Sequence, residues 1–342
     1  MTPPNAPLEV LSTVAFSDEL LAMLRELSPR IRITVIPTRA VEDLPTDLLG
    51  RVEVLYTDRI IPQPGQCPNL KWVQFHFAGI DFALDAPLLK QPDIHFTTLS
   101  GAAAPQVAEY AVMMLLALGH HLADIIGNQT KADWPRNKWE RFSPLELRGS
   151  TVGVLGYGSI GREIARLLHP WGVQLLAVKR DAMHPEDGGY IPAGMGDPAG
   201  DYFTRLYPMQ AIKSMLGECD FIIISLPLTT QTQGLIGVDA LAACKPTAQI
   251  VHIGRGGVVD QAALLAALQD RKLAGAALDV FSEEPLPPNS PFWKLHNVII
   301  SPHIAGVSAH YQDRAAAMFA ENMRRYLEGS PLLNKFDPAR GY

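Results

Sequence analysis

The chain has 342 residues, of which 47% are hydrophobic and 19% are charged, and its formal net charge is -6. A chain of this length can bury two cores of ordinary size, so we expect a globular protein of two domains. The negative net charge and the lack of any run of Lys or Arg argue against nucleic acid as a partner, because that partner would be held through its phosphates.

The cysteines and the apolar runs bear on the compartment. The three cysteines, Cys67, Cys219 and Cys244, have no metal-type spacing, so we expect free thiols in a reducing compartment and no metal site. The longest strongly apolar run, 111–118, is too short to cross a bilayer. The first ten residues have neither the basic nor the apolar region of a signal peptide. We therefore expect a cytoplasmic protein with no membrane partner.

The first hundred residues alternate between strand-like and helix-like segments. Strand-like runs, each ending in Gly, Pro, Asp or a small polar cluster, occupy residues 8–16, 31–37, 52–58, 70–77 and 94–100. A helical pattern covers 17–27, and the whole region predicts one open α/β layer. A long helix is expected from about residue 105 to 126. Its apolar residues occupy most of its circumference, which suits a helix buried at a domain junction.

The most informative motif is the glycine-rich turn within TVGVLGYGSIG, at 151–161. A β-branched apolar strand leads into Gly156-x-Gly158-x-x-Gly161, and a helical segment follows. In such a unit the first glycine permits a tight turn, the second lets the backbone approach a pyrophosphate, and the third allows close helix–strand packing. A glycine-rich turn without a ligand is the alternative, but the flanking strand and helix favour a dinucleotide site.

The chain after this turn predicts a second sheet. Near-continuous apolar runs, typical of parallel strands covered on both faces, occupy residues 151–156, 173–180, 220–227, 248–254, 275–281 and 297–302. This pattern indicates a doubly wound sheet. The stretch 184–201 is rich in Gly and Pro and has no periodicity, so we expect a long surface loop there, either decorative or covering the cofactor.

Seven motifs, in this order, resemble the D-isomer-specific 2-hydroxyacid dehydrogenase family. They are AGID at 78–81, VAE at 107–109, GYGSIG at 156–161, SLPLT at 225–229, GRGGVVD at 254–260, ALDVFSEEPL at 277–286 and SPHIAG at 301–306. The resemblance covers nearly the whole chain. It implies an α/β protein of two doubly wound parallel-sheet domains, with a Rossmann-type cofactor domain inserted into a flavodoxin-like substrate domain.

The resemblance also implies domain boundaries. Residues 1–104 and 305–342 would form the substrate, or catalytic, domain, to which the C-terminal helix at 309–329 returns. Residues 105–304 would form the dinucleotide-binding domain. The substrate would bind at the carboxyl ends of the strands, in the cleft between the domains.

Three residues would carry the reaction, again by resemblance. Reduction of a 2-oxo acid by a nicotinamide needs a cation that holds the carboxylate and polarises the ketone, and an acid that protonates the oxygen. Arg255 would be the cation, because its planar fork suits a carboxylate. His303 would be the acid/base, and Glu284 the carboxylate that stabilises its protonated form. The alternatives are a surface arginine, a structural histidine and a solvated loop acid.

The remaining contacts follow from the same motifs. The substrate carboxylate would be bound by Arg255 and by backbone N–H groups around Ala78 and Gly79, where small residues allow close approach. Asp279 would contact the nicotinamide carboxamide or support the site. The residues expected to bind the cofactor are Gly156, Gly158, Ser159, Ile160, Gly161, Lys179, Arg180, Leu226, Pro227, Thr232, Ile253, Gly254, Asp279 and Gly306.

The end of the second strand of this unit bears on the cofactor's identity. NAD-specific folds place an Asp or Glu there, about twenty residues past the glycine turn, to bind the ribose hydroxyls. Here Lys179 takes that position and Arg180 follows it. Two cations can bind a 2'-phosphate, so we predict that NADP is preferred and NAD possible. Asp181 would reach the ribose after a shift of register, and a solvated strand end is a further alternative.

Two positions depart from the family pattern, and both concern contacts to the cofactor. His252 stands where asparagine is common, and Gln106 where Ser or Thr is frequent. The resemblance further implies a homodimer formed through the cofactor domain. The apolar helix after residue 105 and the segment 128–142, with Trp134 and Trp139, offer surface that a monomer would not expose.

Other functions stay open at this point. A dinucleotide-sensing corepressor of the same fold is expected to carry a long disordered tail or an apolar groove, whereas here the last helix is expected close to Tyr342. A formate dehydrogenase would carry glutamine in place of Glu284. The residues therefore favour a glyoxylate/hydroxypyruvate-reductase-like oxidoreductase that acts on a small 2-oxo or D-2-hydroxy acid.

Overall fold

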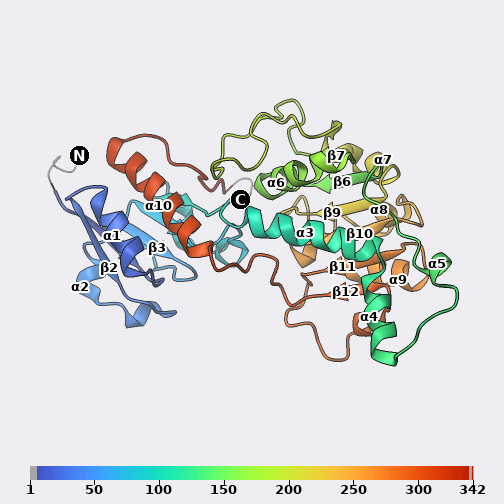
Figure 1. Cartoon of the computed structure of the whole chain (residues 1–342). Coiled ribbons are helices and arrows are strands. Elements are labelled where there is room, and N and C mark those ends of the chain that lie inside the picture. Colours follow the sequence, from blue (N-terminus) through green and yellow to red (C-terminus); the bar gives the residue numbers. More distant parts are fainter. Residues whose placement is uncertain (1–5, 339–340, 342) are drawn as a thin grey trace. The chain divides into compact units, whose positions relative to one another are not determined.

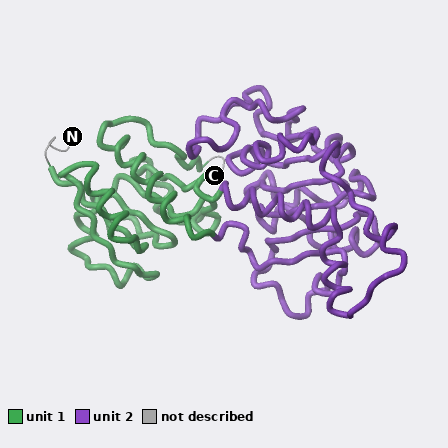
Figure 2. The backbone as a smooth tube through the Cα atoms, viewed as in Figure 1, with its two compact units in different colours: residues 1–103, 308–342 green, residues 104–307 purple. Residues whose placement is uncertain are grey.

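The structure is a computed structural model that describes residues 6–338 and 341. It divides the chain into two compact units (Figures 1 and 2). Unit 1 comprises residues 1–103 and 308–342, and unit 2 comprises residues 104–307. Unit 2 is thus a continuous segment of chain that interrupts unit 1. Each unit is built around one parallel sheet.

The sheet of unit 1 has five parallel strands in the order β2-β1-β3-β4-β5. The strands are β1 (Leu8–Ser12), β2 (Ile31–Val35), β3 (Val54–Thr57), β4 (Trp72–Phe75) and β5 (His95–Thr97). This is the flavodoxin-like order expected from the sequence. Every residue of β3 and β4 is buried, as is typical of parallel strands covered on both faces.

The helices of unit 1 come from both ends of the chain. They are α1 (Asp18–Glu26), α2 (Thr46–Leu49) and α10 (Tyr311–Glu328), with the 3₁₀ turns η1 (Val41–Asp43), η2 (Asp81–Ala83) and η3 (Pro87–Lys90). Ser17 caps α1 by accepting a hydrogen bond from the Leu20 N–H. The Phe319 ring of α10 lies 5.4 Å from the Trp72 ring, so the C-terminal helix helps to form this core.

The sheet of unit 2 has seven parallel strands in the order β12-β11-β10-β9-β6-β7-β8. They are β6 (Thr151–Leu155), β7 (Gln174–Val178), β8 (Arg205–Tyr207), β9 (Phe221–Ile224), β10 (Gln249–His252), β11 (Gly275–Leu278) and β12 (Val298–Ile300). Counted from β6, this is the Rossmann order with one strand added at the end. The predicted fold class is confirmed. The sequence pattern did not reveal β8, a short strand that begins with an exposed arginine.

The helices of unit 2 are α3 (Ala104–Gly119), α4 (Leu122–Lys131), α5 (Lys138–Arg141), α6 (Ser159–Leu168), α7 (Ile212–Leu216), α8 (Val238–Ala242) and α9 (Gln261–Gln269). Its 3₁₀ turns are η4 (His169–Trp171), η5 (Met209–Ala211), η6 (Gly256–Val258) and η7 (Pro291–Lys294). Helix α3 runs beside α6 (Figure 1). Cys67 in unit 1 and Cys219 and Cys244 in unit 2 are buried free thiols, as predicted.

The single long helix predicted over 105–126 is wrong, because the chain breaks into α3 and α4. His121 takes a left-handed backbone conformation with φ 56°, and the two helices meet at 63°. The Leu145 N–H donates to the Gly119 carbonyl, and a Cβ on Gly119 would lie 2.6 Å from the Leu145 carbonyl oxygen. The returning chain therefore occupies the end of α3. Among the described residues no single helix is long and apolar enough to cross a membrane, and only this bent pair, taken together, meets that criterion.

Candidate active site

The three candidate catalytic residues follow three neighbouring strands of unit 2. Arg255 comes after β10, Glu284 after β11 and His303 after β12. The last residues of these strands are aligned across the sheet, since His252 pairs with Leu278 and Leu278 with Ile300. In doubly wound folds the carboxyl edge of the sheet is where ligands bind. The sheet therefore delivers all three side chains to that edge.

Two glycines hold the Arg255 turn close to its neighbours. A Cβ on Gly254 would lie 2.6 Å from the Leu226 carbonyl oxygen, and one on Gly256 would lie 2.0 Å from the Phe281 carbonyl carbon. Only glycine fits such approaches, so the turn is fixed against the segments that follow β9 and β11. Arg255 is half-buried, and its Nη1 donates to the Gly254 carbonyl at 3.0 Å.

Glu284 and His303 form a hydrogen-bonded pair. The distance from His303 Nδ1 to Glu284 Oε2 is 2.7 Å, and the other carboxylate oxygen accepts the Phe281 N–H at 2.9 Å. The side chain of His303 is 48% exposed and that of Glu284 is 36% exposed, so solvent and ligands can reach both. Because the Nδ1–H donates its hydrogen bond to the carboxylate, Nε2 is the nitrogen that can exchange a proton with a ligand.

Asp279 holds the turn that carries His303. It is almost fully buried, and its Oδ1 accepts the Ser301 hydroxyl at 2.5 Å and the Ile304 N–H at 2.9 Å. Its Oδ2 accepts the Ala305 N–H at 2.9 Å. Both oxygens thus bind groups on either side of His303. Of the two roles expected for Asp279, contact with the carboxamide or support of the site, this arrangement favours support.

The glycine turn fits the pyrophosphate of a dinucleotide. A Cβ on Gly161 would lie 2.2 Å from the Gly156 carbonyl oxygen, which explains the close contact between α6 and β6. Gly156 has φ 106°, a conformation that favours glycine. A Cβ on Gly158 would meet nothing within 4 Å. That open space lies at the start of α6, where Ser159 and Ile160 provide the first helical N–H groups.

The end of β7 carries the residues expected to distinguish the two cofactors. Lys179 Nζ donates to the carbonyl oxygens of His184 and Glu186, the latter at 2.9 Å. Burial, with help from the nearby Arg162 charge, lowers the Lys179 pKa from its usual value. The Asp181 carboxylate binds the Met183 N–H at 3.1 Å and His184 Nδ1 at 2.8 Å. Arg180 is exposed.

Other expected cofactor residues line the ends of β9 and β10. Leu226 and Ile253 are buried, and the Thr232 hydroxyl donates to the Pro227 carbonyl at 2.6 Å. The Gly306 carbonyl accepts Gln106 Nε2 at 2.8 Å. Gln106, which stands where the family often has Ser or Thr, therefore binds the SPHIAG segment directly.

His252, which like Gln106 differs from the family pattern, is a buried histidine within β10. Neither ring nitrogen has a hydrogen-bond partner of normal geometry among the described residues. Burial lowers its pKa to about 4, while backbone groups of Ile224 and Arg255 oppose this in part. The ring is therefore neutral at pH 7, and it lies in the strand that leads directly to the Arg255 turn.

Ala78 and Gly79 follow β4 in unit 1 and are half-buried. The sequence pattern did not identify His76, which precedes them, as part of the site. His76 is buried, and its Nδ1 lies 2.6 Å from the Tyr56 hydroxyl. The Tyr311 hydroxyl donates to the His76 carbonyl at 2.6 Å. Burial lowers the His76 pKa to about 4, so a neutral imidazole supports this loop.

Known proteins are similar to this chain in sequence and in fold. Residues 112–305 match the family model described as the D-isomer specific 2-hydroxyacid dehydrogenase, NAD binding domain. A glyoxylate reductase from Thermofilum pendens is 35% identical over 287 residues, which are 82% of this chain and 80% of that protein.

Two solved structures are similar to this chain. A D-isomer specific 2-hydroxyacid dehydrogenase from Xanthobacter autotrophicus Py2, in complex with NADPH and MES, has a TM-score of 0.81 at 28% identity, over 98% of this chain and 100% of that one. An NADPH-dependent glyoxylate/hydroxypyruvate reductase from Sinorhizobium meliloti, in complex with NADP and sulfate, has a TM-score of 0.77 at 25% identity, over 98% and 100%.

The chain belongs to the D-isomer specific 2-hydroxyacid dehydrogenase family. It is an oxidoreductase that transfers hydride between a nicotinamide cofactor and a small 2-oxo or 2-hydroxy acid, and unit 2 contains its Rossmann-type NAD-binding domain. The predicted family, fold class and reaction class are confirmed.

Proposed function

We propose that the protein is an NADPH-preferring reductase of small 2-oxo acids such as glyoxylate and hydroxypyruvate, with Arg255, Glu284 and His303 as its catalytic residues. The observation that carries this proposal is the 2.7 Å hydrogen bond between His303 Nδ1 and Glu284 Oε2. It orients the imidazole and leaves Nε2 for proton transfer, at the same sheet edge as a half-buried arginine.

Each residue has a defined task in this reaction. A nicotinamide cofactor, when bound, would supply the hydride that C2 of the 2-oxo acid accepts. Arg255 pairs with the substrate carboxylate and polarises the keto oxygen. Nε2 of His303 donates the proton that this oxygen needs, and Glu284 stabilises the imidazolium before the transfer. In the oxidation direction His303 accepts the proton instead.

The preference for NADPH rests on the end of β7, where Lys179 and Arg180 replace the acid of NAD-specific folds. Arg180 is the main candidate for the 2'-phosphate, because a guanidinium binds phosphate through forked hydrogen bonds. Two similar proteins were solved with NADPH or NADP bound. Unit 1 would be the substrate domain, in which backbone N–H groups around Ala78 and Gly79 bind the substrate carboxylate.

The test is a steady-state screen with both reduced cofactors. The panel is glyoxylate, hydroxypyruvate, pyruvate, phenylpyruvate and branched 2-oxo acids. We expect the highest kcat/KM with NADPH and with the smallest acids, and a D-hydroxy acid as product. Arg180→Ala should reduce the preference for NADPH. Equal or better use of NADH by the wild type would contradict the cofactor proposal, and cofactor binding without turnover across the panel would favour a dinucleotide sensor.

A further inference from the structure

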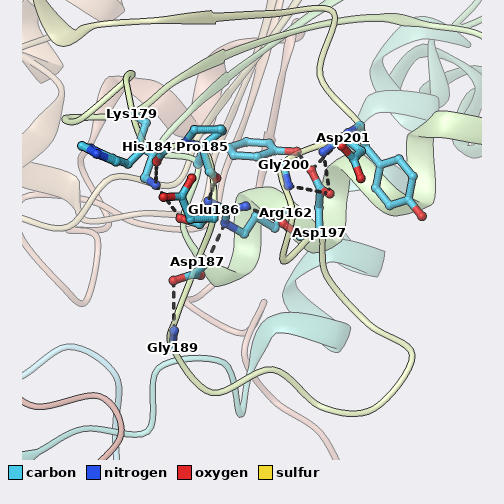
Figure 3. Close-up of polar contacts among 12 residues, drawn as sticks. Arg162, Lys179, His184, Pro185, Glu186, Asp187, Gly189, Asp197, Gly200 and Asp201 are labelled. Atoms are coloured by element: carbon cyan, nitrogen blue, oxygen red, sulfur yellow. Dashed lines mark hydrogen bonds and ion pairs between the residues drawn. The ribbon is translucent and has the colours of Figure 1, made fainter.

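A long loop in unit 2 is fastened to the glycine turn by buried polar side chains (Figure 3). This loop, residues 181–204, joins β7 to β8, and although the structure describes all of it, it forms no helix or strand. The composition of residues 184–201 within it predicts a surface loop that is either decorative or covers the cofactor. Three residues in or next to the glycine turn, Tyr157, Arg162 and Glu163, bind it directly.

Arg162 makes the central contacts. It lies in α6, and its side chain is completely buried. Its two terminal nitrogens donate to the carbonyl oxygens of Asp197 and Pro185, and its Nε lies 3.4 Å from the Asp187 carboxylate. The guanidinium carbon also lies 4.8 Å from the centroid of the Tyr157 ring. This Nε is within ion-pair distance of Asp187 but makes no hydrogen bond of normal geometry to the described residues. Because a buried charge is costly unless it is paired, Arg162 and the loop stabilise each other.

Asp197 fixes the far end of the loop. Its Oδ2 accepts the Tyr157 hydroxyl at 2.5 Å and the Tyr202 N–H at 3.1 Å. Its Oδ1 accepts the N–H groups of Gly200 and Asp201 at 3.1 and 2.8 Å. Burial alone raises the pKa of this carboxyl, but the hydrogen bonds outweigh burial and lower it below its usual value. A charged Asp197 thus ties the loop to the residue between Gly156 and Gly158.

Two further side chains complete the attachment. Lys179 Nζ, at the end of β7, donates to the carbonyl oxygens of His184 and Glu186. Glu163, nearly fully buried, accepts the Gly196 N–H at 2.6 Å. Side chains of the elements that surround the glycine turn therefore hold the loop at 184–187 and again at 196–197. Asp197 in turn holds residues 200–202 from within the loop.

We infer that Arg162 is a positioning residue for the cofactor, one that fixes residues 184–187 as a preformed wall beside Arg180 before the cofactor binds. The inference rests on the proposed use of NADP(H). Arg162 directly follows Gly161, so a single side chain connects the pyrophosphate turn with the loop after β7. The 2'-phosphate would lie at the end of β7, where this loop begins. On this account Lys179 supports the wall by binding its carbonyl groups, and Arg180 is left as the main phosphate contact.

The charge on Asp187 makes the inference specific. While Arg162 pairs with it, this carboxylate adds little negative potential near the 2' position of the ribose. Without Arg162 the carboxylate loses its ion-pair partner and keeps the hydrogen bond from the Gly189 N–H at 3.1 Å. It then repels a 2'-phosphate, whereas NADH has an uncharged hydroxyl at that position. Loss of Arg162 should therefore weaken the binding of NADPH far more than that of NADH.

The experiment compares full-length wild type, Arg162→Met and Arg162→Met with Asp187→Asn. Arg205→Met is the matched control, since Arg205 stacks on the Tyr207 ring at 4.7 Å and lies outside the loop. Hydrogen–deuterium exchange without cofactor reports on the loop, and fluorescence titration gives the Kd of NADPH and NADH. In Arg162→Met we expect faster exchange over 184–201 and a Kd for NADPH raised about tenfold, through repulsion between Asp187 and the 2'-phosphate. The Kd for NADH should change less than about threefold.

Asp187→Asn in the Arg162→Met background should restore part of the NADPH affinity without restoring slow exchange. If Arg162→Met does not fold, Asp187→Asn alone in the wild type tests the pair, and faster exchange over 184–187 is then expected. Unchanged exchange, or an equal loss of affinity for both cofactors, would overturn the inference. A wild type that binds NADH as tightly as NADPH would defeat the proposed preference, whereas the exchange of the cofactor-free loop still decides the role of Arg162.

Discussion

His303 takes a left-handed backbone conformation, with φ 55°, that residues with a side chain adopt rarely. The hydrogen bonds around it explain how this conformation persists. Asp279 accepts the N–H groups of the next two residues, Ile304 and Ala305, and the hydroxyl of Ser301. A buried carboxylate thus stabilises the turn on both sides of the histidine. Such locally strained residues are frequent at functional sites, which agrees with the catalytic role proposed for His303.

His303→Ala and Arg255→Ala should fail in different ways. Loss of the imidazole removes proton transfer, so kcat should fall by on the order of a hundredfold or more, with KM for the 2-oxo acid little changed. Loss of Arg255 removes the counter-charge of the substrate carboxylate, so KM should rise as well as kcat fall. Steady-state kinetics at saturating NADPH measure both. A kcat for His303→Ala close to that of the wild type would exclude His303 as the proton donor.

His252 makes the stability of the protein depend on pH. Its pKa is about 4 in the folded protein and near 6.5 in an unfolded chain, so between these values only the unfolded chain binds the proton. We therefore expect the free energy of unfolding to fall as pH falls, by about 2 kcal/mol between pH 7 and pH 5 from this residue. His252→Asn should remove that part of the pH dependence, as urea denaturation at the two pH values would measure. The exposed His296 provides the control His296→Asn, and equal slopes in both variants would contradict the expectation.

At the scale of the element, two glycines of the glycine turn are expected to have different roles: Gly161 in packing and Gly158 in cofactor binding. A Cβ on Gly161 would meet the Gly156 carbonyl at 2.2 Å, so Gly161→Ala forces α6 away from β6 and should lower the free energy of unfolding by about 1–3 kcal/mol. A Cβ on Gly158 meets nothing within 4 Å, so Gly158→Ala should fold normally but fill the space that a pyrophosphate needs. Thermal unfolding without cofactor and NADPH titration distinguish the two. Weaker NADPH binding with unchanged Tm is expected only for Gly158→Ala.

The strands were predictable where burial on both faces produces continuous apolar runs. The run FIII of β9 is such a case, because every residue of the strand is buried. β8 escaped prediction, since an edge strand that starts with an exposed Arg205 carries no such pattern. The break after α3 escaped as well. It depends on Leu145, which bonds to the Gly119 carbonyl from far along the chain.

Part of the candidate site could likewise be predicted from the sequence, and part could not. Arg255, Glu284 and His303 follow strands and lie in short motifs, so their common sheet edge could be inferred from the order of the segments. The attachment of the β7–β8 loop could not. Arg162 stands in an amphipathic helical pattern, where an arginine is ordinarily solvated, and only the fold shows that its charge is buried against Asp197 and Asp187.

At the scale of the whole molecule, we propose a homodimer formed through unit 2. Exposed apolar side chains gather on α4 and the segment after it: Leu122, Ile125, Ile126, Trp134 and Trp139 are between 42% and 85% exposed. Sedimentation at micromolar concentration should give twice the chain mass of 37.4 kDa. Ile126→Lys should shift the protein towards monomer, because a charge is then buried at the interface. Val238→Lys, at a residue of α8 that is 67% exposed, is the control. A wild type that sediments only as a monomer would exclude the dimer.

The interruption of unit 1 by unit 2 has a consequence for biosynthesis. Tyr326 of α10 stacks on Trp72 at 5.5 Å, and Phe319 lies 4.7 Å from Tyr56, so the core of unit 1 is incomplete without α10. On the ribosome, α10 emerges only after all of unit 2 has been made. Unit 2 is continuous and can close its own core first, reversing the usual N-terminal-first order. Until α10 emerges, Trp72 and Tyr56 of the first sheet lack its packing. The nascent chain should therefore depend most on chaperones during that interval.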